Sequence, residues 1–551
     1  MTRVESGAHV RSAEENDRML LALAGGPTGD WRVLSVDSGE TAAAGRGPRE
    51  LADLVRSRER ERPRWVWDDT ARWYPALLDA GVRVARCHDL RLARAILRRS
   101  VATAGSELAR APGDAWDAGA AAPASGDTLL GFEEASGEEG ALDPLEELAR
   151  QETALASAAG SGRLRLLLAA ESVGALIARE IAAAGLPWRA DVHDRVLTEA
   201  LGPRPYFGGR PERLEALADR IRAELDAPDL NPDSPADLIR ALRRGGLAVE
   251  STRSWELQSI EHPVIPPLLE YKKLSRLLTA NGWAWLDAWV HGGRFRPEYV
   301  VGGVVTGRWA TSGGGALQLP RQIRAAVVAD PGWKLVVADA AQLEPRILAA
   351  LSGDSAMAAA GRGRDLYQGI VDAGVVPDRP RAKVAMLGAM YGATSGEAGR
   401  LLPRLARAYP RSVAHVEAAA RAGERGEPVS TWLGRSSPPG AALDSDVVDA
   451  RSSQRAREWG RFTRNFVVQG TAAEWALCWM GELRARLREA DAHLVYFLHD
   501  EVIVHAPENE ADRVVEIVRE SAVRAGRALF GDSDVDFPVT VAVVDSYDQA
   551  K

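Results

Sequence analysis

Apolar and polar positions divide the first part of the chain into two segments of different character. In residues 18–100, short apolar runs at 31–37, 63–69 and 82–89 alternate with helical stretches. Short apolar runs bounded by polar residues predict strands, and their mixture with helices favours a small α/β domain. Residues 102–141 are instead rich in Ala, Gly, Ser, Pro and Glu, which predicts a flexible loop or linker.

Helical periodicity dominates the rest of the chain, and strand patterns return at only a few places. Residues 145–290 are mostly helical, and a second helical block covers 341–490. The strand patterns lie at 299–307, 334–340, 493–506 and 537–545. A sheet built from strands so far apart, with helices inserted between them, predicts a sheet-based domain that carries helical subdomains.

Length and composition limit the class of protein. At 551 residues two or more domains are expected, and 46% hydrophobic with 26% charged residues is ordinary for a soluble protein. No apolar run approaches the ~20 residues that span a bilayer, and the polar start lacks a signal-peptide core. Cys87 and Cys478 are too few for a disulfide framework or a zinc site. We therefore expect a cytoplasmic, soluble protein, monomeric and without a membrane segment.

The charged residues show an unusual bias. The net charge is −8, but nucleic-acid binding depends on a local basic surface rather than on the total charge. Only five of the 69 basic residues are lysines. A lysine inside a motif therefore calls for a chemical reason why arginine would not serve.

Acidic residues stand directly at the ends of two apolar strands. Asp339 ends one strand, and a helical pattern starts near Gln342. His499-Asp500-Glu501 lies between two apolar strands, at the turn of a tight hairpin. Buried carboxylates brought together repel one another, and Mg²⁺, which prefers oxygen ligands, would relieve this. Two such ions suit in-line phosphoryl transfer. The alternative is that the acids only cap a helix and form a polar turn.

The segment 378–392 predicts a helix that could hold an anion. It has a proline near its start and a glycine at its end. Arg379, Lys383, Leu387 and Tyr391 are spaced four apart and share one stripe of the helix. Like charges at this spacing, close to a helix N-terminus, are unfavourable, and a nucleoside triphosphate would resolve the conflict. The alternative is a solvated basic helix.

Taken in order, these and further motifs resemble the family-A DNA polymerases, the class of bacterial DNA polymerase I. The resemblance covers residues 265–551. Its segments are a thumb helix at 269–274, Thr306-Gly307-Arg308, a backbone-tracking segment with Gln318 and Arg324, motif A at 339–346, motif B at 379–392, a minor-groove reader with Arg461, Asn465 and Gln469, and motif C at 499–501. Seven motifs in family order form a strong signal.

The resemblance implies a template-directed DNA polymerase that adds deoxynucleotides to a primer 3′ end, in repair or replication. Asp339 and Asp500 would bind two Mg²⁺ ions, and Glu501 would support the site. Arg379 and Lys383 would hold the triphosphate. Lys383 would also give a proton to the departing pyrophosphate, which a guanidinium cannot do.

The resemblance also implies contacts to the nucleotide and to primer–template DNA. Glu344 would lie under the sugar and exclude a 2′-hydroxyl, and Tyr391 would stack near the template base. The other nucleotide-site positions are Gln342, Leu387 and His499. The DNA contacts would come from Arg308, Thr306, Gln318, Arg324, Arg461, Asn465 and Gln469. Binding would be sequence-independent and would weaken with salt.

Four residues depart from the family pattern. Leu387 stands where an aromatic residue is usual, which predicts altered nucleotide affinity and sugar discrimination. Ala340-Ala341 replaces the commoner Tyr-Ser, and Pro345 lies in the motif A helix, so a displaced Glu344 is expected. The metal-binding acids are intact, and an active enzyme is expected.

The N-terminal part resembles the proofreading 3′–5′ exonuclease domain of the same family, which has a ribonuclease-H-like fold. That activity needs an Asp-x-Glu pair on the first strand, but here Gly39 follows Asp37 at the second acid's place. Asp68 or Asp69 could match the second motif, and Leu148-x₃-Glu152 replaces the later Tyr-x₃-Asp. The resemblance implies a degenerate domain, kept for packing or DNA contact.

The expected fold is therefore an α/β ribonuclease-H-like domain followed by an α+β right-hand polymerase, with an antiparallel palm sheet and helical thumb and fingers. The expected divisions are a degenerate exonuclease-like domain at 1–150, helical connection and thumb at 151–300, first palm part at 301–350, fingers at 351–450 and second palm part at 451–551.

Two other functions remain as alternatives. The first is a catalytically impaired protein on a polymerase scaffold that holds gapped or nicked DNA; Leu387 and the missing motif A aromatic favour it. The second is a nuclease function, as residual 3′–5′ exonuclease activity beside polymerisation or as a stand-alone nuclease that depends on Asp37.

Overall fold

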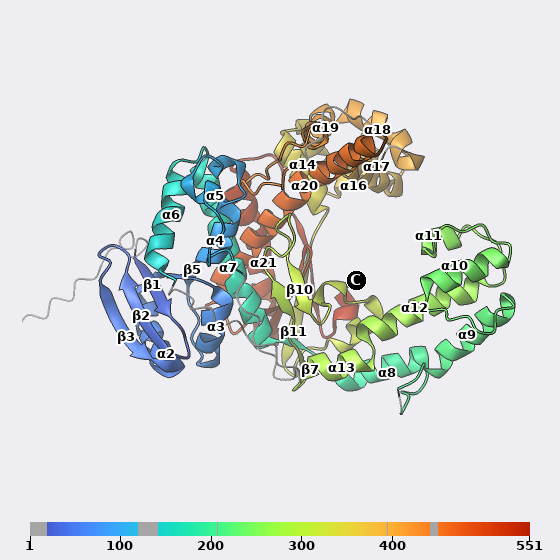
Figure 1. Ribbon diagram of the computed structural model, residues 1–551, viewed down its shortest axis with the longest axis horizontal. Helices are drawn as coiled ribbons and strands as arrows, with labels where there is room; N and C mark the ends of the chain where they lie inside the picture. Colours follow the sequence, from blue (N-terminus) through green and yellow to red (C-terminus); the bar gives the residue numbers. More distant parts are fainter. Residues whose placement is uncertain (1–18, 119–141, 207, 394, 441–449, 551) are drawn as a thin grey trace, which may run out of the picture.

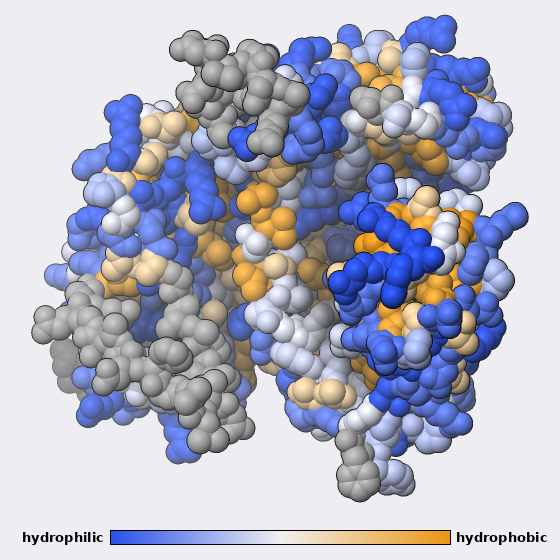
Figure 2. Space-filling model, turned by 45° about the vertical axis from the view of Figure 1, so that its right-hand side comes forward, coloured by the Kyte–Doolittle hydropathy of each residue, from blue (hydrophilic) through white to orange (hydrophobic). Residues whose placement is uncertain are grey.

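A sheet domain at the N-terminus, a central sheet and two helical lobes make up the molecule (Figure 1). The computed structural model describes residues 19–118, 142–206, 208–393, 395–440 and 450–550. Figure 2 shows the surface hollowed in the middle of one face, where the lobes meet, with mostly hydrophilic residues on their outer surfaces. Among the described helices, none is both long and apolar enough to cross a lipid bilayer.

The N-terminal domain is built on a mixed five-stranded sheet with the strand order β3-β2-β1-β4-β5. Strands β1 to β3 are antiparallel, and β4 and β5 run parallel to β1. The strands are β1 (Leu20–Gly25), β2 (Asp30–Ser35), β3 (Thr41–Arg46), β4 (Arg64–Trp67) and β5 (Arg86–Asp89). The helices are α2 (Gly47–Arg58), α3 (Thr70–Asp79), α4 (Leu90–Leu97), α5 (Glu107–Arg110) and α6 (Pro144–Ala156). An α/β domain is thus confirmed here.

Two expectations for this part of the chain are wrong. The first strand is β1, an apolar run that was not predicted, so the run at 31–37 is the second strand, and Asp37 lies in the exposed turn after β2. Residues 102–118 are not a flexible linker, because they contain α5 and an ordered turn in which Asp117 pairs with Arg94 and Arg98. The remainder of the predicted linker, 119–141, lies outside the described residues.

A mostly helical region connects this domain to the central sheet. The long helix α7 (Ser161–Ala184) contacts both α3 and β5 of the N-terminal domain and β12 of the central sheet. One helical lobe follows, and its elements are α8 (Ala190–Leu201), α9 (Glu212–Glu224), α10 (Pro235–Arg244), α11 (Ser254–Leu257), α12 (Ile265–Asn281) and α13 (Trp283–Trp289). Short pairings join β6 (Leu186–Pro187), β7 (Val290–His291) and β8 (Arg294–Phe295), and β9 (Glu298–Val300) with β10 (Ala310–Gly313).

The strand predicted at 299–307 is shorter than expected. It ends at Val300, and the chain turns before β10 because Gly302 and Gly307 adopt positive φ angles of 61° and 85°. Glycine reaches this backbone region without the steric cost that a side chain brings. The turn brings Thr306 to Gln469 and Arg308 to Glu344.

The central sheet has the strand order β12-β13-β11-β14. All of its pairings are antiparallel, and this direction was predicted. Its strands are β11 (Trp333–Ala340), β12 (His493–Leu498), β13 (Glu501–Pro507) and β14 (Val539–Val544). Residues 335–338 of β11 and 502–504 of β13 are buried apolar side chains, and α21 (Ala511–Phe530) packs against both strands. This core fixes the ends of β11 and β13, where the predicted acids lie.

The second helical lobe follows β11. Its elements are α14 (Leu343–Ser352), α15 (Ser355–Gly361), α16 (Leu366–Asp372), α17 (Arg379–Tyr391), α18 (Gly396–Ala408) and α19 (Pro410–Glu424). The chain returns to the sheet through the long helix α20 (Ala450–Leu487), which packs against α19 and α21. Helix α17 matches its predicted bounds, with Asp378 as N-cap and Gly392 as C-cap.

Candidate active site

The pairing of β11 with β13 brings the predicted acids together. Asp339 lies directly opposite Glu501 in this ladder, and the backbone N–H of Ala340 donates to the carbonyl oxygen of Asp500 at 2.9 Å. Directly opposed residues of an antiparallel pair have Cβ atoms about 4.5–5.5 Å apart on the same face. Asp339 and Asp500 are half-buried, whereas Glu501 is only 2% exposed.

The Glu501 side chain is held by a residue that follows β14. The hydroxyl of Tyr547 donates a hydrogen bond to Glu501 Oε1. Burial and the neighbouring Glu501 carboxylate raise the pKa of Tyr547 well above its usual value, so Tyr547 remains a hydrogen-bond donor. The hydrogen bond orients the Glu501 carboxylate, which lies opposite Asp339.

The donor set at this sheet edge suits a hard divalent cation. Carboxylate oxygens are the ligands that Mg²⁺ prefers, and Mg²⁺ usually takes only one or two of them from the protein, with phosphate and water completing its shell. Within the described ranges, no group of three or more His, Cys, Asp or Glu side chains is arranged to hold a metal. Asp339 and Asp500 therefore fit a site that a phosphate-bearing substrate completes.

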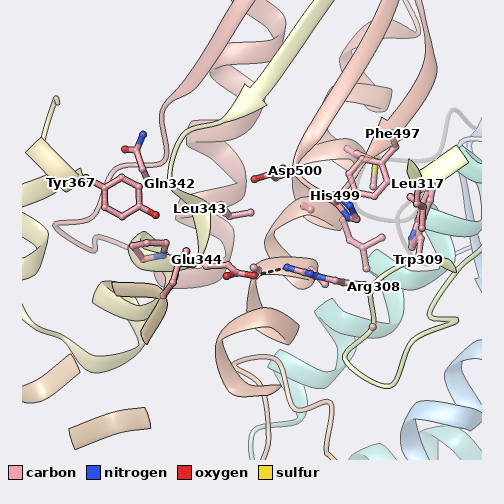
Figure 3. A pocket seen from close by; sticks show the side chains of 18 residues that line it. Arg308, Trp309, Leu317, Gln342, Leu343, Glu344, Tyr367, Phe497, His499 and Asp500 are labelled. Atoms are coloured by element: carbon pink, nitrogen blue, oxygen red, sulfur yellow. Dashed lines mark hydrogen bonds and ion pairs between the residues drawn. The ribbon is translucent and has the colours of Figure 1, made fainter. Parts of the chain in front are cut away.

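A cavity of about 310 Å³ opens beside these acids (Figure 3). Its polar side includes Arg308, Gln342, Glu344, His499 and Asp500. Its apolar side is lined by Trp309, Leu317, Leu343, Leu387, Ala472, Ala476, Leu477, Met480 and Phe497. An apolar cavity with a few convergent polar groups is the usual form of a small-molecule site.

Two residues of the cavity have a strained backbone. Gln342 and His499 adopt positive φ angles of 51° and 58°, a left-handed conformation that non-glycine residues rarely take. Gln342 follows β11, which carries Asp339, and His499 lies in the turn between β12 and β13, directly before Asp500. Such strain clusters at functional sites, where surrounding structure holds it in place. Burial lowers the pKa of the His499 imidazole, which favours its neutral form.

Glu344 projects from the first turn of α14 and is held on both sides. Arg308 Nη2 donates to Glu344 Oε1 at 2.5 Å, and the Tyr391 hydroxyl donates to Glu344 Oε2 at 3.1 Å. Pro345 does not break the helix, because it lies in the first turn, where a backbone N–H has no intrahelical acceptor. Burial and the Glu344 charge raise the pKa of Tyr391.

The four residues predicted to share one face of α17 have different surroundings. Leu387 lines the cavity and Tyr391 reaches Glu344. Arg379 is bound at the other end of the stripe, since its Nη2 donates to Asp365 Oδ2 at 2.8 Å. Lys383 is exposed, does not line the cavity, and has no hydrogen bond or ion pair to any described residue. It lies one turn before Leu387, on the same stripe.

The structure adds residues that the motifs did not single out. Tyr367 from α16 lines the cavity, and the Arg379 guanidinium lies 5.5 Å from its ring centre. Asp365 also accepts from Gln342 Nε2 at 3.3 Å, so it joins α17 to the end of β11. Arg346, only 1% exposed, binds Asp536 at 2.7 Å and backbone carbonyls of three segments. A lone tyrosine, aspartate or arginine carries no spacing signal, so sequence alone could not identify them.

The remaining residues that were predicted to contact DNA lie on α20, in the turn before β10 and in the segment after it. Arg461, Asn465 and Gln469 are spaced four apart on α20 and share a stripe. The Thr306 hydroxyl, itself buried, donates to Gln469 Oε1 at 3.2 Å. Gln318 is exposed, and Arg324 lies over the Tyr547 ring at 4.3 Å. A hydrogen bond thus joins the Thr306–Arg308 turn to the α20 stripe.

The acids that the exonuclease resemblance singled out lie in different local surroundings. Strand β1 contains only Leu, Ala and Gly, and its Ala22 and Ala24 pack in an apolar cluster with Leu148. Asp68 is buried and accepts from Trp73 and Arg72, whereas Asp69 caps α3. Glu152 forms an ion pair with Arg165 at 2.6 Å. The place of the first acid pair is therefore filled by apolar side chains.

Comparisons with known proteins agree on one family. The family model described as DNA polymerase family A matches residues 210–549. "DNA polymerase I, thermostable" from Thermus thermophilus is 31% identical over 290 residues, which cover 47% of this chain and 34% of that protein. "DNA polymerase I" from Chloroflexus aurantiacus is 27% identical over 393 residues, 65% of this chain and 39% of that protein. The matches thus span only a third to two fifths of these relatives.

One solved structure is similar over nearly its whole length. It is titled "POL domain of Pol1 from M. smegmatis complex with DNA primer-template and dNTP". The similarity covers 97% of each chain with a TM-score of 0.68 and 19% sequence identity. At this identity the match establishes a common fold, which includes the N-terminal sheet domain as well as the central sheet and its lobes.

Proposed function

Because the chain belongs to DNA polymerase family A, we propose that it is a template-directed DNA polymerase that extends a primer 3′ end with deoxynucleotides. One observation carries the proposal. The β11–β13 ladder sets Asp339 opposite Glu501 and fixes Asp500 against Ala340, beside a cavity of the size a nucleotide site requires. The partners are primer–template DNA and deoxynucleoside triphosphates, and the protein works as a cytoplasmic monomer in DNA repair or replication.

The proposed function gives each part of the fold a role. The central sheet is the palm, formed by residues 301–350 and 451–551. The helical lobe within 151–300 is the thumb, and the lobe within 351–450 is the fingers. The N-terminal domain, within 1–150, is a ribonuclease-H-like domain; its order β3-β2-β1-β4-β5 with three antiparallel and two parallel strands supports this assignment.

Asp339 and Asp500 would hold two Mg²⁺ ions at the palm edge. When bound, the ions activate the primer 3′-hydroxyl and stabilise charge on the transferred phosphoryl group. Glu501, oriented by Tyr547, supports the two ligands. Lys383 is the exposed cation nearest along α17 to the cavity-lining Leu387; it contacts the triphosphate and donates a proton to pyrophosphate. Arg379 would contact the same phosphates from the start of the helix.

The nucleotide would bind in the cavity, and the duplex DNA would contact the stripe of residues on α20. Glu344, fixed by Arg308 and Tyr391, limits the space beside the nucleotide sugar, in a site that Gln342, Leu387 and His499 complete. Duplex DNA contacts the stripe formed by Arg461, Asn465 and Gln469, and further contacts come from Thr306, Arg308, Gln318 and Arg324. These residues would contact backbone phosphates and minor-groove acceptors that all correct base pairs share, so binding is independent of the DNA sequence.

We assign no nuclease function to the N-terminal domain. A two-metal nuclease requires acids on the first strand, and here that strand is apolar while Asp37 lies in an exposed turn after the second. The packing of Ala22 and Ala24 against Leu148 leaves no carboxylate at this position. The domain contributes instead to packing, through the contacts of α3 and β5 with α7.

A primer-extension gel tests the proposed function. The purified protein is expected to extend a 5′-labelled primer on a template with Mg²⁺ and deoxynucleotides, and to stop when EDTA removes the metal. The label also reports degradation, which is expected to be absent with single-stranded substrate. Failure to incorporate any nucleotide with Mg²⁺ or Mn²⁺ on several templates would favour the binding-only alternative.

The sugar selectivity is expected to depend on Glu344. In Glu344→Ala the side chain that limits the cavity is removed, and the preference for deoxy- over ribonucleotides should fall by about 10–100-fold. Tyr391→Phe loses a single hydrogen bond to Glu344, worth about 0.5–1.5 kcal/mol, so its preference should fall about 2–10-fold. The ratio of kcat/KM for the two nucleotides, from single-nucleotide incorporation, gives both values. An unchanged ratio in Glu344→Ala would exclude the role.

A further inference from the structure

A buried ion pair lies against the turn that carries Thr306 and Arg308. Glu171 of α7 pairs with Arg435, which lies in the loop 429–437 between α19 and α20 (elements in Figure 1). The Glu171 side chain is only 1% exposed and the Arg435 side chain 13%. Neither residue lines the cavity beside the palm acids, and neither belongs to a motif predicted from the sequence. Any effect of the pair on the reaction must therefore pass through neighbouring residues.

The ion pair packs on the two glycines that shape this turn. A methyl group added to Gly307 would lie 2.5 Å from Arg435 Nε, and one added to Gly302 would lie 3.7 Å from both Glu171 carboxylate oxygens. The first distance is shorter than a side chain could adopt, so the guanidinium fills the space beside Gly307. Arg308 follows Gly307 directly in the chain. The guanidinium therefore limits where the backbone of Arg308 can lie.

The loop 429–437 is itself fixed to α20. The Thr431 hydroxyl donates to Glu474 Oε1, and the Leu433 backbone N–H donates to Glu474 Oε2 at 3.0 Å. The Thr431 backbone N–H donates to the Arg435 carbonyl oxygen at 2.9 Å, which closes the loop. The Thr431 side chain also packs against Gly470 of α20, so closely that a methyl group there would overlap it. These contacts give Arg435 a fixed position relative to α20.

The same loop contacts the N-terminal domain and α7. The Ser100 hydroxyl donates to the Gly434 carbonyl oxygen at 2.8 Å, and the Val101 backbone N–H donates to the Ser436 hydroxyl at 2.9 Å. Gly434 has a φ of 107°, and a methyl group added to it would lie 3.0 Å from Leu164 Cδ2 of α7. Because three parts of the fold hold the loop, it presents the Arg435 guanidinium to the turn as a fixed surface.

We propose that Arg435 is a positioning residue of the polymerase reaction, an inference that rests on the proposed function. Its guanidinium, paired with Glu171, fixes the turn from which Arg308 reaches Glu344. The Arg308–Glu344 bond in turn places the carboxylate that limits the space beside the nucleotide sugar. A planar guanidinium bound to a carboxylate has a defined orientation, which an apolar side chain of similar volume does not impose. Loss of the ion pair should therefore lower sugar discrimination while the chemical step is retained.

A paired substitution tests this role without leaving a buried charge. Glu171→Leu/Arg435→Met removes both charges, so the protein should stay folded, as urea denaturation checks. Its ratio of kcat/KM for deoxy- over ribonucleotides, from single-nucleotide incorporation, should fall about 3–10-fold. Arg435→Lys keeps the charge but loses the planar group beside Gly307, and should lower the ratio about 2–5-fold. An unchanged ratio in the paired variant overturns the proposal; if that variant does not fold, an unchanged ratio in Arg435→Lys does so.

A second buried ion pair on α7 provides the matched control. Glu180 pairs with Arg484 of α20 at 2.7 Å, and both side chains are at most 10% exposed. Glu180 lies about 2.5 turns beyond Glu171 on the helix, where it accepts from Tyr74. Glu180→Leu/Arg484→Met should keep the ratio within about twofold of the unmodified protein. An equal fall in this control would mean that loss of any buried pair on α7 lowers discrimination, and would overturn the assignment to Arg435.

A cycle with Glu344→Ala shows whether the effect passes through Glu344. In that background the carboxylate is already missing, so adding Glu171→Leu/Arg435→Met should lower the ratio no further. Residues that act through one shared contact give such non-additive effects, whereas independent residues give additive ones. The same fold-change in both backgrounds would mean that the ion pair acts elsewhere, and would overturn the proposal.

Fluorescence anisotropy with labelled primer–template in EDTA gives a result that does not depend on catalysis. The turn also carries Thr306, which binds Gln469 of the proposed DNA-contacting stripe. The paired variant at Glu171 and Arg435 should therefore bind DNA about 2–5-fold more weakly than the control pair. If the unmodified protein binds DNA but incorporates no nucleotide, the proposed activity fails and this comparison decides the placement of the turn. Equal affinities of the two paired variants would overturn that placement, and absence of DNA binding would overturn both proposals.

Discussion

Asp500→Asn is expected to lower the rate of primer extension at least about a thousandfold, equivalent to ~4 kcal/mol of transition-state stabilisation. The change keeps the shape of the side chain and removes its charge. Its backbone contact with Ala340 is made by the carbonyl oxygen and stays in place. The loss should therefore come from the carboxylate itself, as a ligand of the proposed metal pair with Asp339.

A control at the other end of the same sheet separates this effect from general charge loss. Asp545 follows β14 and accepts from Lys334 at 2.7 Å, far along the sheet from Asp500. Asp545→Asn should extend primers within about threefold of the unmodified protein, since exposed ion pairs contribute about 0–1 kcal/mol. Fluorescence anisotropy with labelled primer–template should give similar affinities for both variants. Extension by Asp500→Asn within tenfold of the unmodified rate would refute the assignment.

The parts of the site that could be predicted are those with a strong local pattern. The strand that ends at Asp339 and the hairpin around Asp500 are short apolar runs bounded by polar residues, and both were predicted. Helix α17 has an N-cap, an early proline and a terminal glycine, so its bounds were also evident. The residue spacing further indicated that Leu387 and Tyr391 share one face of the helix.

The contacts that complete the site are non-local, and no local pattern encodes them. The register that sets Asp339 opposite Glu501 depends on the packing of strands far apart in the chain. Arg379, which was predicted to hold the triphosphate, also binds Asp365, an acid that no motif includes. The bonds from Arg308 and Tyr391 to Glu344 likewise join three separate segments.

The N-terminal domain shows how one missed strand changes an interpretation. Strand β1 lies in the middle of its sheet, so it is apolar throughout and lacks the alternation of a half-buried strand. Because β1 lacks this alternation, the sequence pattern predicts the run at 31–37 as the first strand and Asp37 as a remnant of the acid pair. The structure moves Asp37 to an exposed turn, and so removes the residue on which a nuclease function depended.

A buried ion pair joins α20 to α7 beside the N-terminal domain. Arg484 of α20 donates to Glu180 of α7 at 2.7 and 2.9 Å, and to the Val84 and Ala85 carbonyls. The Tyr74 hydroxyl of α3 donates to the same carboxylate at 2.5 Å. Burial alone would raise the pKa of Glu180, but the Arg484 charge and hydrogen bonds outweigh it and hold the pKa below its usual value. The carboxylate is therefore ionised in the folded protein.

Arg484→Met is expected to lower the free energy of unfolding by about 3–5 kcal/mol, because it leaves the Glu180 charge buried without its partner. Urea denaturation followed by tryptophan fluorescence measures the loss. Tyr74→Phe, which removes one hydrogen bond, should cost only about 1–3 kcal/mol.

The double variant Glu180→Leu/Arg484→Met separates the cost of an unpaired charge from lost packing. Replacing both partners with apolar side chains removes the buried charge, so most of the stability lost in Arg484→Met should return. In the unmodified protein the contribution of Glu180 is present above about pH 4.5 and is lost as the pH falls through its lower folded-state pKa. Arg484→Met should therefore show a weaker decline of stability with acid. A double variant as unstable as Arg484→Met would mean that the arginine acts through its carbonyl contacts rather than through the charge of Glu180.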